Sequence, residues 1–350
     1  MTNTPCVITK SETATWKSRH DWITSEGLPN FSFLSKQFGT SIVPVAECDN
    51  REYNSQHKIE MSFIDYLNHW KNLIQTPEIS SENLYLKDWH FQREYPSYEA
   101  YKTPKYFHSD WLNEYHEREN DDYKFVYMGP KGTWTPLHVD VFGSYSWSAN
   151  VCGRKKWWMF PPEHEKFLKD ETNKLIYLVE DGSASKHRDL CLEVIQEPGE
   201  VIFVPSGWHH QVWNIDHTIS INHNWFNACN ILYVWHCLNV AALDVEKEIS
   251  DCKTSDDWEE QWQIILKVHH GFNYADFYHL LEYIFEKRVK YLKSLDVDDY
   301  SKEWQEMFDI FAIKNVCSKM LNSNLPLKLR KLVEYLFINV ENVISKSENK

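Results

Sequence analysis

One short stretch of the chain carries a histidine and an aspartate at a spacing that suits metal binding. In "PLHVD", residues 136–140, the pattern predicts a strand, so His138 and Asp140 project from one face and Val139 from the other. The two polar side chains start about 7 Å apart, and tips at that spacing can converge on one atom. A hydrogen-bonded pair on a solvent-facing sheet would have the same pattern, so the metal hypothesis needs support from elsewhere in the chain.

A second stretch, residues 197–225, supplies another nitrogen ligand. The apolar strand 201–204 lies between Pro-Gly and Pro-Ser-Gly turns, and the next strand opens with His209 and His210. Only one of these two can face the interior of a barrel, because neighbouring side chains in a strand point opposite ways. With the His-x-Asp pair, either one completes a set of two histidines and one carboxylate. Such a set holds one side of an octahedral iron and leaves the opposite positions free.

The donor types favour Fe(II) over other metals. Structural zinc sites are usually closed by four His or Cys ligands, and calcium or magnesium takes mostly oxygen ligands. The eight cysteines are scattered through the chain without a Cys-x-x-Cys pair, so neither a zinc ribbon nor a disulfide framework is indicated.

A lysine in the strand "RKKWWMF" suggests an anionic ligand near the metal. Lys155 shares one face of this strand with Trp157 and Met159. Burying a lysine among large apolar groups costs several kcal/mol unless an anion accompanies it, and a dicarboxylate would supply one. The hydroxyl of Thr135 could bind the same carboxylate. Alternatively, the basic side chains of this strand extend into water.

The pattern of apolar residues predicts three regions. Residues 121–225 contain short β-rich runs separated by turn residues, which indicates a sandwich or barrel, interrupted after residue 166 by a short helix and a polar loop. The preceding part is mixed and includes a helix over 61–75 with Phe63, Ile64, Leu67, Trp70 and Ile74 on its buried face. The part after 226 is helical, and its first helix buries Ile231, Val234, Trp235, Leu238, Ala242 and Val245.

Composition limits the classes of protein to which the chain can belong. Its 350 residues are 42% hydrophobic and 25% charged, which is enough for a packed core. A net charge of −14 argues against a protein that coats nucleic acid. The first residues lack the apolar segment of a signal peptide, and the longest uncharged run, 217–243, is interrupted by histidine and asparagine. We therefore expect an intracellular protein without a membrane span.

Several of these stretches resemble the jumonji-C domain, a double-stranded β-helix of the cupin type that uses Fe(II), 2-oxoglutarate and dioxygen. They are "TPLHVD", "GRKKWWMFPP", "PGEVIFVPSGWHH" and "ISINHNW", in the family's order. The resemblance implies an α+β fold with a support segment at 1–118, the barrel at 119–228 and a helical region at 229–350. It implies that His138, Asp140 and His209 bind iron, with His210 as the alternative, that Lys155 and Thr135 hold the distal carboxylate of 2-oxoglutarate, and that Asn224 lines the iron pocket. Tyr127, Ser148 and Asn150 match less specific positions of that pocket.

The chain is most similar to the jumonji-C domain-containing protein four group, over roughly residues 40–290, through stretches such as "LYLKDWHF" and "VYMGPKGTWTPLH". This resemblance implies a cytoplasmic lysyl hydroxylase that acts on a lysine of eukaryotic translation release factor one. An acidic protein suits a lysine-bearing partner. Two alternatives remain: a histone lysine demethylase, although no zinc-binding reader module is visible, and a non-catalytic jelly-roll module. The C-terminal helices could cap the barrel or join two copies of the chain.

Overall fold

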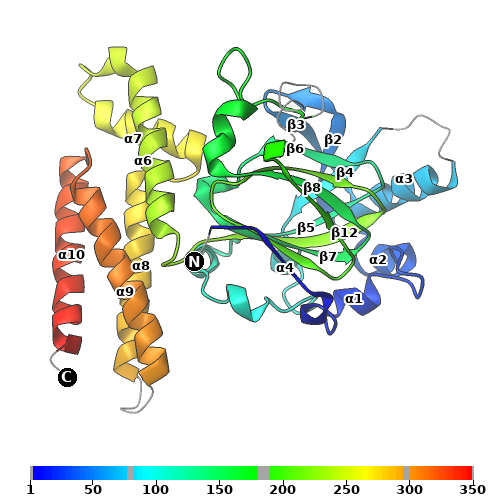
Figure 1. Ribbon diagram of the computed structural model, residues 1–350, viewed down its shortest axis with the longest axis horizontal. Helices are drawn as coiled ribbons and strands as arrows, with labels where there is room; N and C mark the ends of the chain where they lie inside the picture. The colour runs from blue at the N-terminus through cyan, green and yellow to red at the C-terminus, as the bar shows by residue number, and fades with distance from the viewer. Residues whose placement is uncertain (1–2, 77–81, 180–188, 295–299, 349–350) are drawn as a thin grey trace. The chain divides into compact units, whose positions relative to one another are not determined.

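The computed structural model describes residues 3–76, 82–179, 189–294 and 300–348 (Figure 1). The chain folds into two compact units. The first comprises Met1–His108, Asp122–Asp140 and Tyr145–Asn224, and the second comprises Ser109–Asp121, Val141–Ser144 and Trp225–Lys350. Two short pieces of the second unit, Ser109–Asp121 and Val141–Ser144, therefore lie in the sequence between segments of the first unit. The three-part division expected from the sequence stays a prediction.

Two antiparallel sheets build the first unit. The larger has the order β1-β10-β7-β12-β5-β4-β2-β3 and the smaller the order β6-β11-β8-β9. This is the double-stranded β-helix of the cupin type, so the predicted fold class is confirmed. The strands are β1 (Cys6–Ile8), β2 (Ile42–Glu52), β3 (Ser55–Ser62), β4 (Leu84–Trp89), β5 (Lys124–Gly129), β6 (Trp134–His138), β7 (Tyr145–Cys152), β8 (Lys155–Phe160), β9 (Leu192–Gln196), β10 (Val201–Val204), β11 (His209–Asn214) and β12 (Thr218–Trp225).

Alternation of side chains divides the smaller sheet into an inner and an outer face. The inner face meets strand β10 of the larger sheet in one apolar cluster, formed by Trp157, Met159, Ile202, Val204, Trp208 and Val212. The outer face carries Trp158 and Phe160, which pack with Leu168 and Val179 from the insert after β8. The strand "RKKWWMF" therefore alternates as predicted.

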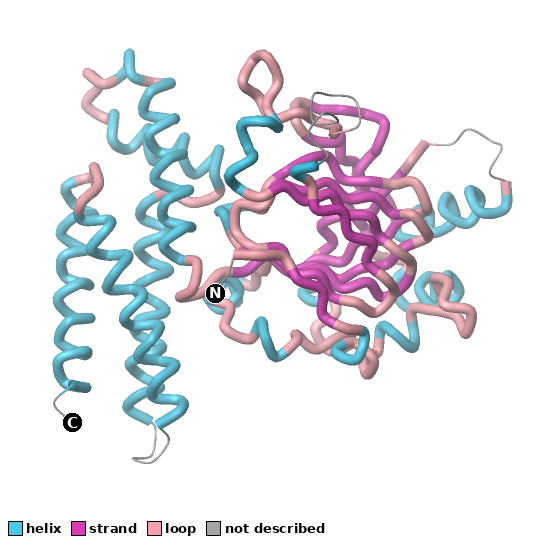
Figure 2. The backbone as a smooth tube through the Cα atoms, viewed as in Figure 1, coloured by secondary structure: helices cyan, strands magenta, loops and turns pink. Residues whose placement is uncertain are grey.

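Helices of the first unit lie outside the strands, as Figure 2 shows for the segment before β4. They are α1 (Ser18–Asp21), α2 (Phe31–Phe38), α3 (Phe63–Gln75) and α4 (Phe91–Glu94). The side chain of Ser62 caps α3 by accepting from the backbone N–H of Asp65. Only part of the stripe predicted for α3 is correct: Ile64 and Ile74 are exposed, and Tyr66 is buried instead.

The second unit is helical, as predicted. Its helices are α5 (Trp111–His116), α6 (Ile231–Glu248), α7 (Trp258–His270), α8 (Tyr274–Ser294), α9 (Tyr300–Leu321) and α10 (Leu327–Glu348). The six residues predicted to form the apolar face of α6 are its buried residues. Among the described residues, no helix has the length and apolar character that a membrane span requires.

Short 3-10 turns connect these elements. They are η1 (Lys10–Glu12), η2 (Lys105–Phe107), η3 (Glu117–Glu119), η4 (Val141–Gly143), η5 (Pro162–Leu168) and η7 (Ser250–Cys252). The helix predicted after residue 166 is therefore a 3-10 helix that begins earlier, at Pro162, and ends at Leu168. Residues 180–188 of the predicted polar loop lie outside the described part of the chain.

Candidate metal centre

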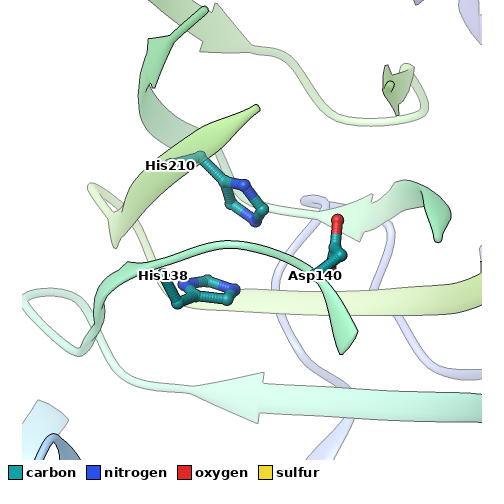
Figure 3. Close-up of side chains that lie close together, drawn as sticks. All are labelled: His138, Asp140 and His210. Atoms are coloured by element: carbon teal, nitrogen blue, oxygen red, sulfur yellow. The ribbon is translucent and has the colours of Figure 1, made fainter. Parts of the chain in front are cut away.

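Three side chains lie close together, two from the neighbouring strands β6 and β11 and one from the segment that follows β6. The ligand atoms of His138, Asp140 and His210 all lie within 4.8 Å of one another (Figure 3). His138 ends β6, Asp140 follows two residues later, and His210 is the second residue of β11. The two histidines are direct partners in the antiparallel β6–β11 ladder, which brings their ring centroids to 4.2 Å. The register therefore joins residues that are distant in the sequence.

The structure corrects the choice of His209 as the third ligand. Because His210 pairs with His138, these two side chains point to the same face, and the neighbouring His209 points to the other. His209 pairs with Phe160, which packs in the cluster on the outer face of the smaller sheet. Burial lowers the pKa of His209, and Glu165 of the insert acts in the opposite direction. The alternative from the sequence, His210, is the residue that completes the cluster.

Backbone carbonyls fix the tautomers of the two clustered histidines. Nδ1 of His138 lies 2.8 Å from the carbonyl oxygen of Pro136, and Nδ1 of His210 lies 3.0 Å from that of Trp208. A carbonyl oxygen only accepts, so each Nδ1 carries a proton, and Nε2 is the ring atom left to bind a cation. Burial and the neighbouring His210 ring lower the pKa of His138 to about 3. Neutral imidazoles with free Nε2 atoms are what a bound cation requires.

Two neutral donors orient the carboxylate of the cluster. Oγ of Ser146 donates to one oxygen of Asp140 at 2.7 Å, and Nδ2 of Asn224 donates to the other at 2.9 Å. Neither donor is charged, so the carboxylate keeps its full negative charge for a cation. Two neutral nitrogens and one oriented carboxylate on one side of a position fit Fe(II) with open coordination sites.

A cavity adjoins the cluster and contains most of the site residues predicted from the sequence. Thr135, Lys155 and Asn224 all line it, as do the weaker candidates Tyr127 and Ser148. Asn150 does not line it, because its Nδ2 donates to the carbonyl oxygens of Gly153 and Gln196. The other lining residues are Tyr85, His138, Asp140, Ser146, Trp147, Trp157, His210, Val212 and Asn222. No cysteine is among these lining residues.

Lys155 is buried deep in this cavity. Its side chain is 2% exposed, and its Nζ lies 3.1 Å from the hydroxyl of Tyr85. Among the residues that the structure describes, no carboxylate forms an ion pair with it. Burial and the nearby ammonium of Lys87 lower the pKa of Lys155 to about 7. A buried ammonium in a polar cavity without a carboxylate partner fits the distal carboxylate of 2-oxoglutarate.

Sequence reasoning missed three residues that act on this site. Ser146 shares a strand face with the predicted Ser148, so alternation along "YSWSAN" could have indicated it. Tyr85 and Lys87 lie in β4, where nothing in the sequence connects them to the two histidine stretches. Their contacts depend on β4 pairing with β5 in the larger sheet.

Comparisons with known proteins agree with this geometry. Residues 125–225 match the family described as "JmjC domain, hydroxylase". The chain is 48% identical over 303 residues to the zebrafish (Danio rerio) "2-oxoglutarate and iron-dependent oxygenase JMJD4", covering 83% of this chain and 72% of that protein. The human protein of the same name is 43% identical over 332 residues, covering 91% and 80%. The Arabidopsis thaliana "Arginine-specific demethylase JMJ20" is 41% identical over 357 residues, covering 95% and 74%.

These similarities extend over most of the chain, and the residues that match the JmjC family include His138, Asp140, His210 and Lys155. Iron is therefore the metal and 2-oxoglutarate the cosubstrate of this chain, and the cluster of His138, Asp140 and His210 is the candidate iron site. The chain is a member of the JmjC-domain family, in the JMJD4 group of 2-oxoglutarate- and iron-dependent oxygenases.

Proposed function

We propose that this oxygenase is a protein lysyl hydroxylase that acts in the cytoplasm on a lysine of eukaryotic translation release factor one. The observation that supports the oxygenase chemistry is the cluster of two histidines and one carboxylate beside a buried lysine. The choice of substrate rests on the resemblance of the sequence to the release factor lysyl hydroxylases. The net charge of −14 supports it, because an acidic protein attracts a lysine-bearing partner.

Each residue of the site has a role in this proposal. His138 and His210 would hold iron through Nε2, and Asp140 through its carboxylate. Lys155 and the hydroxyl of Thr135 would bind the distal carboxylate of 2-oxoglutarate. When bound, iron and 2-oxoglutarate would activate dioxygen, so that one of its oxygen atoms is inserted into a C–H bond of the substrate while the other enters succinate as 2-oxoglutarate loses carbon dioxide.

Two pairs of residues around the site have supporting roles in this proposal, one in orienting a metal ligand and the other in excluding water. Ser146 and Asn224 hold the carboxylate ligand in one orientation, which favours a single arrangement of the metal. The rings of Trp147 and Trp157 line the cavity and exclude water from it. Trp134, which begins β6, is not among the lining residues.

The test is a reaction of the purified chain with Fe(II), 2-oxoglutarate and release factor one, followed by tandem mass spectrometry of the lysine-bearing peptide. We expect one added oxygen atom on the lysine, and none with the variant His210→Ala. If succinate forms while the peptide stays unmodified, the chain is an oxygenase of a different substrate.

A demethylase is the second candidate, and the relative named as an arginine-specific demethylase favours it. The same iron chemistry on an N-methyl group releases formaldehyde, so the product loses a methyl group instead of gaining oxygen. Parallel reactions with methylated lysine and methylated arginine histone peptides would distinguish the two. A non-catalytic module would consume no 2-oxoglutarate in either reaction.

The possible joining of two copies through the C-terminal helices stays a prediction. Trp304, Leu327 and Tyr335 of α9 and α10 are between 65% and 73% exposed, which is unusual for side chains of this size. Light scattering over a range of protein concentrations would measure the mass. A monomer mass at all concentrations would contradict the prediction.

A further inference from the structure

Asp88 is a carboxylate that the proposed reaction does not yet use, and its hydrogen-bond partner Tyr127 lines the cavity. It lies in β4 between two residues that pair with β5, Leu86 with Met128 and Trp89 with Val126, and the register shifts between those pairs. Its φ of 61° is left-handed, a conformation that aspartate adopts more readily than most residues. Such a bulge redirects a side chain locally, and bulges are frequent beside active sites.

Tyr127 connects Asp88 to the metal cluster. Its hydroxyl donates to a carboxylate oxygen of Asp88 at 2.6 Å, and its ring lines the cavity. Burial raises the pKa of Tyr127, and the charges of both Asp88 and Asp140 add to this effect. The phenol group of Tyr127 therefore interacts electrostatically with two carboxylates, that of Asp140 in the metal cluster and that of Asp88. The centre of the same ring lies 5.8 Å from Nζ of Lys155.

The carboxylate of Asp88 already has a cationic partner. Lys58 of β3 forms an ion pair with the second oxygen of Asp88. The side chain of Lys58 is 49% exposed and that of Asp88 is 32% exposed, so solvent and a partner can reach the pair. Burial acts to raise the pKa of Asp88, but Lys58, Lys87 and the Tyr127 hydroxyl together lower it below the ordinary value. Asp88 is therefore an ionised, oriented acceptor.

We propose that Asp88 and Tyr127 form the subsite for the cationic end of the substrate side chain, and that Lys58 occupies this subsite until the substrate enters. This inference rests on the proposed function, because it names the group that would recognise a lysine beside the iron. An exposed ion pair contributes little stability, so Lys58 can leave at small cost. The incoming ammonium has the same charge and the same donors, so the carboxylate exchanges one partner for an equivalent one.

The subsite predicts a chemical preference. A protein side chain that ends in an ammonium or guanidinium group can replace Lys58, whereas a neutral side chain of the same length would leave Asp88 either with Lys58 or without a cation. The opposing explanation is that the Lys58–Asp88 pair only ties β3 to β4. The two explanations predict different signs for the change in peptide affinity. If the pair is purely structural, loss of either partner should change the affinity in the same direction. If it is a subsite, loss of Asp88 should weaken peptide binding and loss of Lys58 should strengthen it.

The experiment compares Asp88→Asn with Lys58→Met. Fluorescence anisotropy measures the affinity for a release factor peptide with its lysine intact and for the same peptide with norleucine at that position, and steady-state kinetics gives KM and kcat. We expect Asp88→Asn to weaken binding of the lysine peptide roughly tenfold to a hundredfold. Lys58→Met should strengthen it about twofold to fivefold, because the competing ammonium is gone. The wild type should bind the norleucine peptide about as weakly as Asp88→Asn binds the lysine peptide.

Matched controls come from the exposed ion pair of Lys314 and Glu341, whose charged atoms lie 3.1 Å apart in the helical unit. Lys314→Met and Glu341→Gln remove the same kinds of charge and should leave peptide affinity and KM unchanged. If Asp88→Asn does not fold, as circular dichroism would show, Lys58→Met and the norleucine peptide still test the subsite.

Two outcomes overturn the inference. One is that Asp88→Asn and Lys58→Met shift peptide affinity in the same direction; the other is that the wild type binds the lysine and norleucine peptides equally. Anisotropy needs no turnover: a wild type that binds neither peptide shows that the proposed substrate is wrong, whereas measurable and equal binding of both peptides shows that the subsite is wrong. If the wild type binds lysine in preference to norleucine but leaves the release factor unmodified, the proposed substrate is wrong and the cation subsite stands.

Discussion

Raising the pH from 6 to 8 should weaken the binding of 2-oxoglutarate, because Lys155 loses its proton within this range. Its pKa is about 7 in the absence of cosubstrate, as a result of burial and the neighbouring ammonium of Lys87. The distal carboxylate of 2-oxoglutarate binds the protonated form. Above pH 7 most of the free protein carries a neutral Lys155, so binding must then take up one proton.

The size of this effect follows from the pKa. For one group that must be protonated, the apparent dissociation constant grows as one plus the ratio of neutral to protonated lysine. With a pKa of about 7 the affinity is nearly constant below pH 6, falls about twofold at pH 7 and about tenfold at pH 8. The bound carboxylate raises the pKa of Lys155 in the complex, so the loss continues above pH 8.

Isothermal titration calorimetry can measure both the affinity and the proton uptake. Protein saturated with Mn(II) keeps the histidine ligands neutral at every pH, and buffers of different ionisation enthalpy report the number of protons bound. The control is Lys155→Arg, because a guanidinium stays charged throughout this range. An affinity of the wild type that does not change with pH would refute the reasoning, and so would an equal pH dependence in Lys155→Arg.

Three more predictions concern residues around the site and in the helical unit. His210→Ala should abolish Mn(II) binding in electron paramagnetic resonance titrations, whereas His209→Ala should retain it; the reverse result would restore His209 as the ligand. Ser146→Ala and Asn224→Ala should each weaken Mn(II) binding in the same titration, by about tenfold to a hundredfold, because the carboxylate ligand loses an orienting donor. Arg288 of α8 forms ion pairs with Glu114 of α5 and Asp309 of α9. Arg288→Met removes this shared cation and should lower the free energy of unfolding in urea by about 3–5 kcal/mol; an unchanged value would show that these ion pairs do not stabilise the fold.

Local patterns in the sequence were sufficient to predict elements whose side chains repeat regularly. Alternation separated Lys155 and Trp157 from Trp158 and Phe160 in β8, and the structure shows the same division. The helical spacing of apolar residues identified the buried face of α6. Both patterns arise from the geometry of one element and need no knowledge of its neighbours.

The choice between the two adjacent histidines could not be made this way. Alternation states that one of His209 and His210 faces the interior, but either face of the strand carries apolar residues. The register with β6 decides, because His210 is the residue opposite His138. Register between strands that are some 70 residues apart depends on the whole sheet, and a shift of one residue exchanges the two faces.

The hairpin of β2 and β3 was missed for a different reason. Its first strand contains Pro44, and proline argues against an interior strand because it cannot donate a ladder hydrogen bond. The structure accommodates it because the pairing of β2 with β4 covers only Val45 to Glu47 and leaves Pro44 outside. The polar sequence at the end of β2 also lacks the alternation typical of a half-buried strand.

This hairpin matters for specificity because it lies outside the segment that matches the JmjC domain. That segment, residues 125–225, holds all three metal ligands and Lys155, so it contains what the shared chemistry needs. Lys58 and Asp88 come from β3 and β4, which precede it; Lys58 pairs with Asp88, and Asp88 accepts a hydrogen bond from Tyr127 of β5, which lines the cavity. Under the proposed cation subsite, substrate choice would depend on β3 and β4, and oxygen transfer on residues 125–225. A change of substrate between related oxygenases is then expected to require changes in β3 and β4, while the metal ligands and Lys155 stay the same.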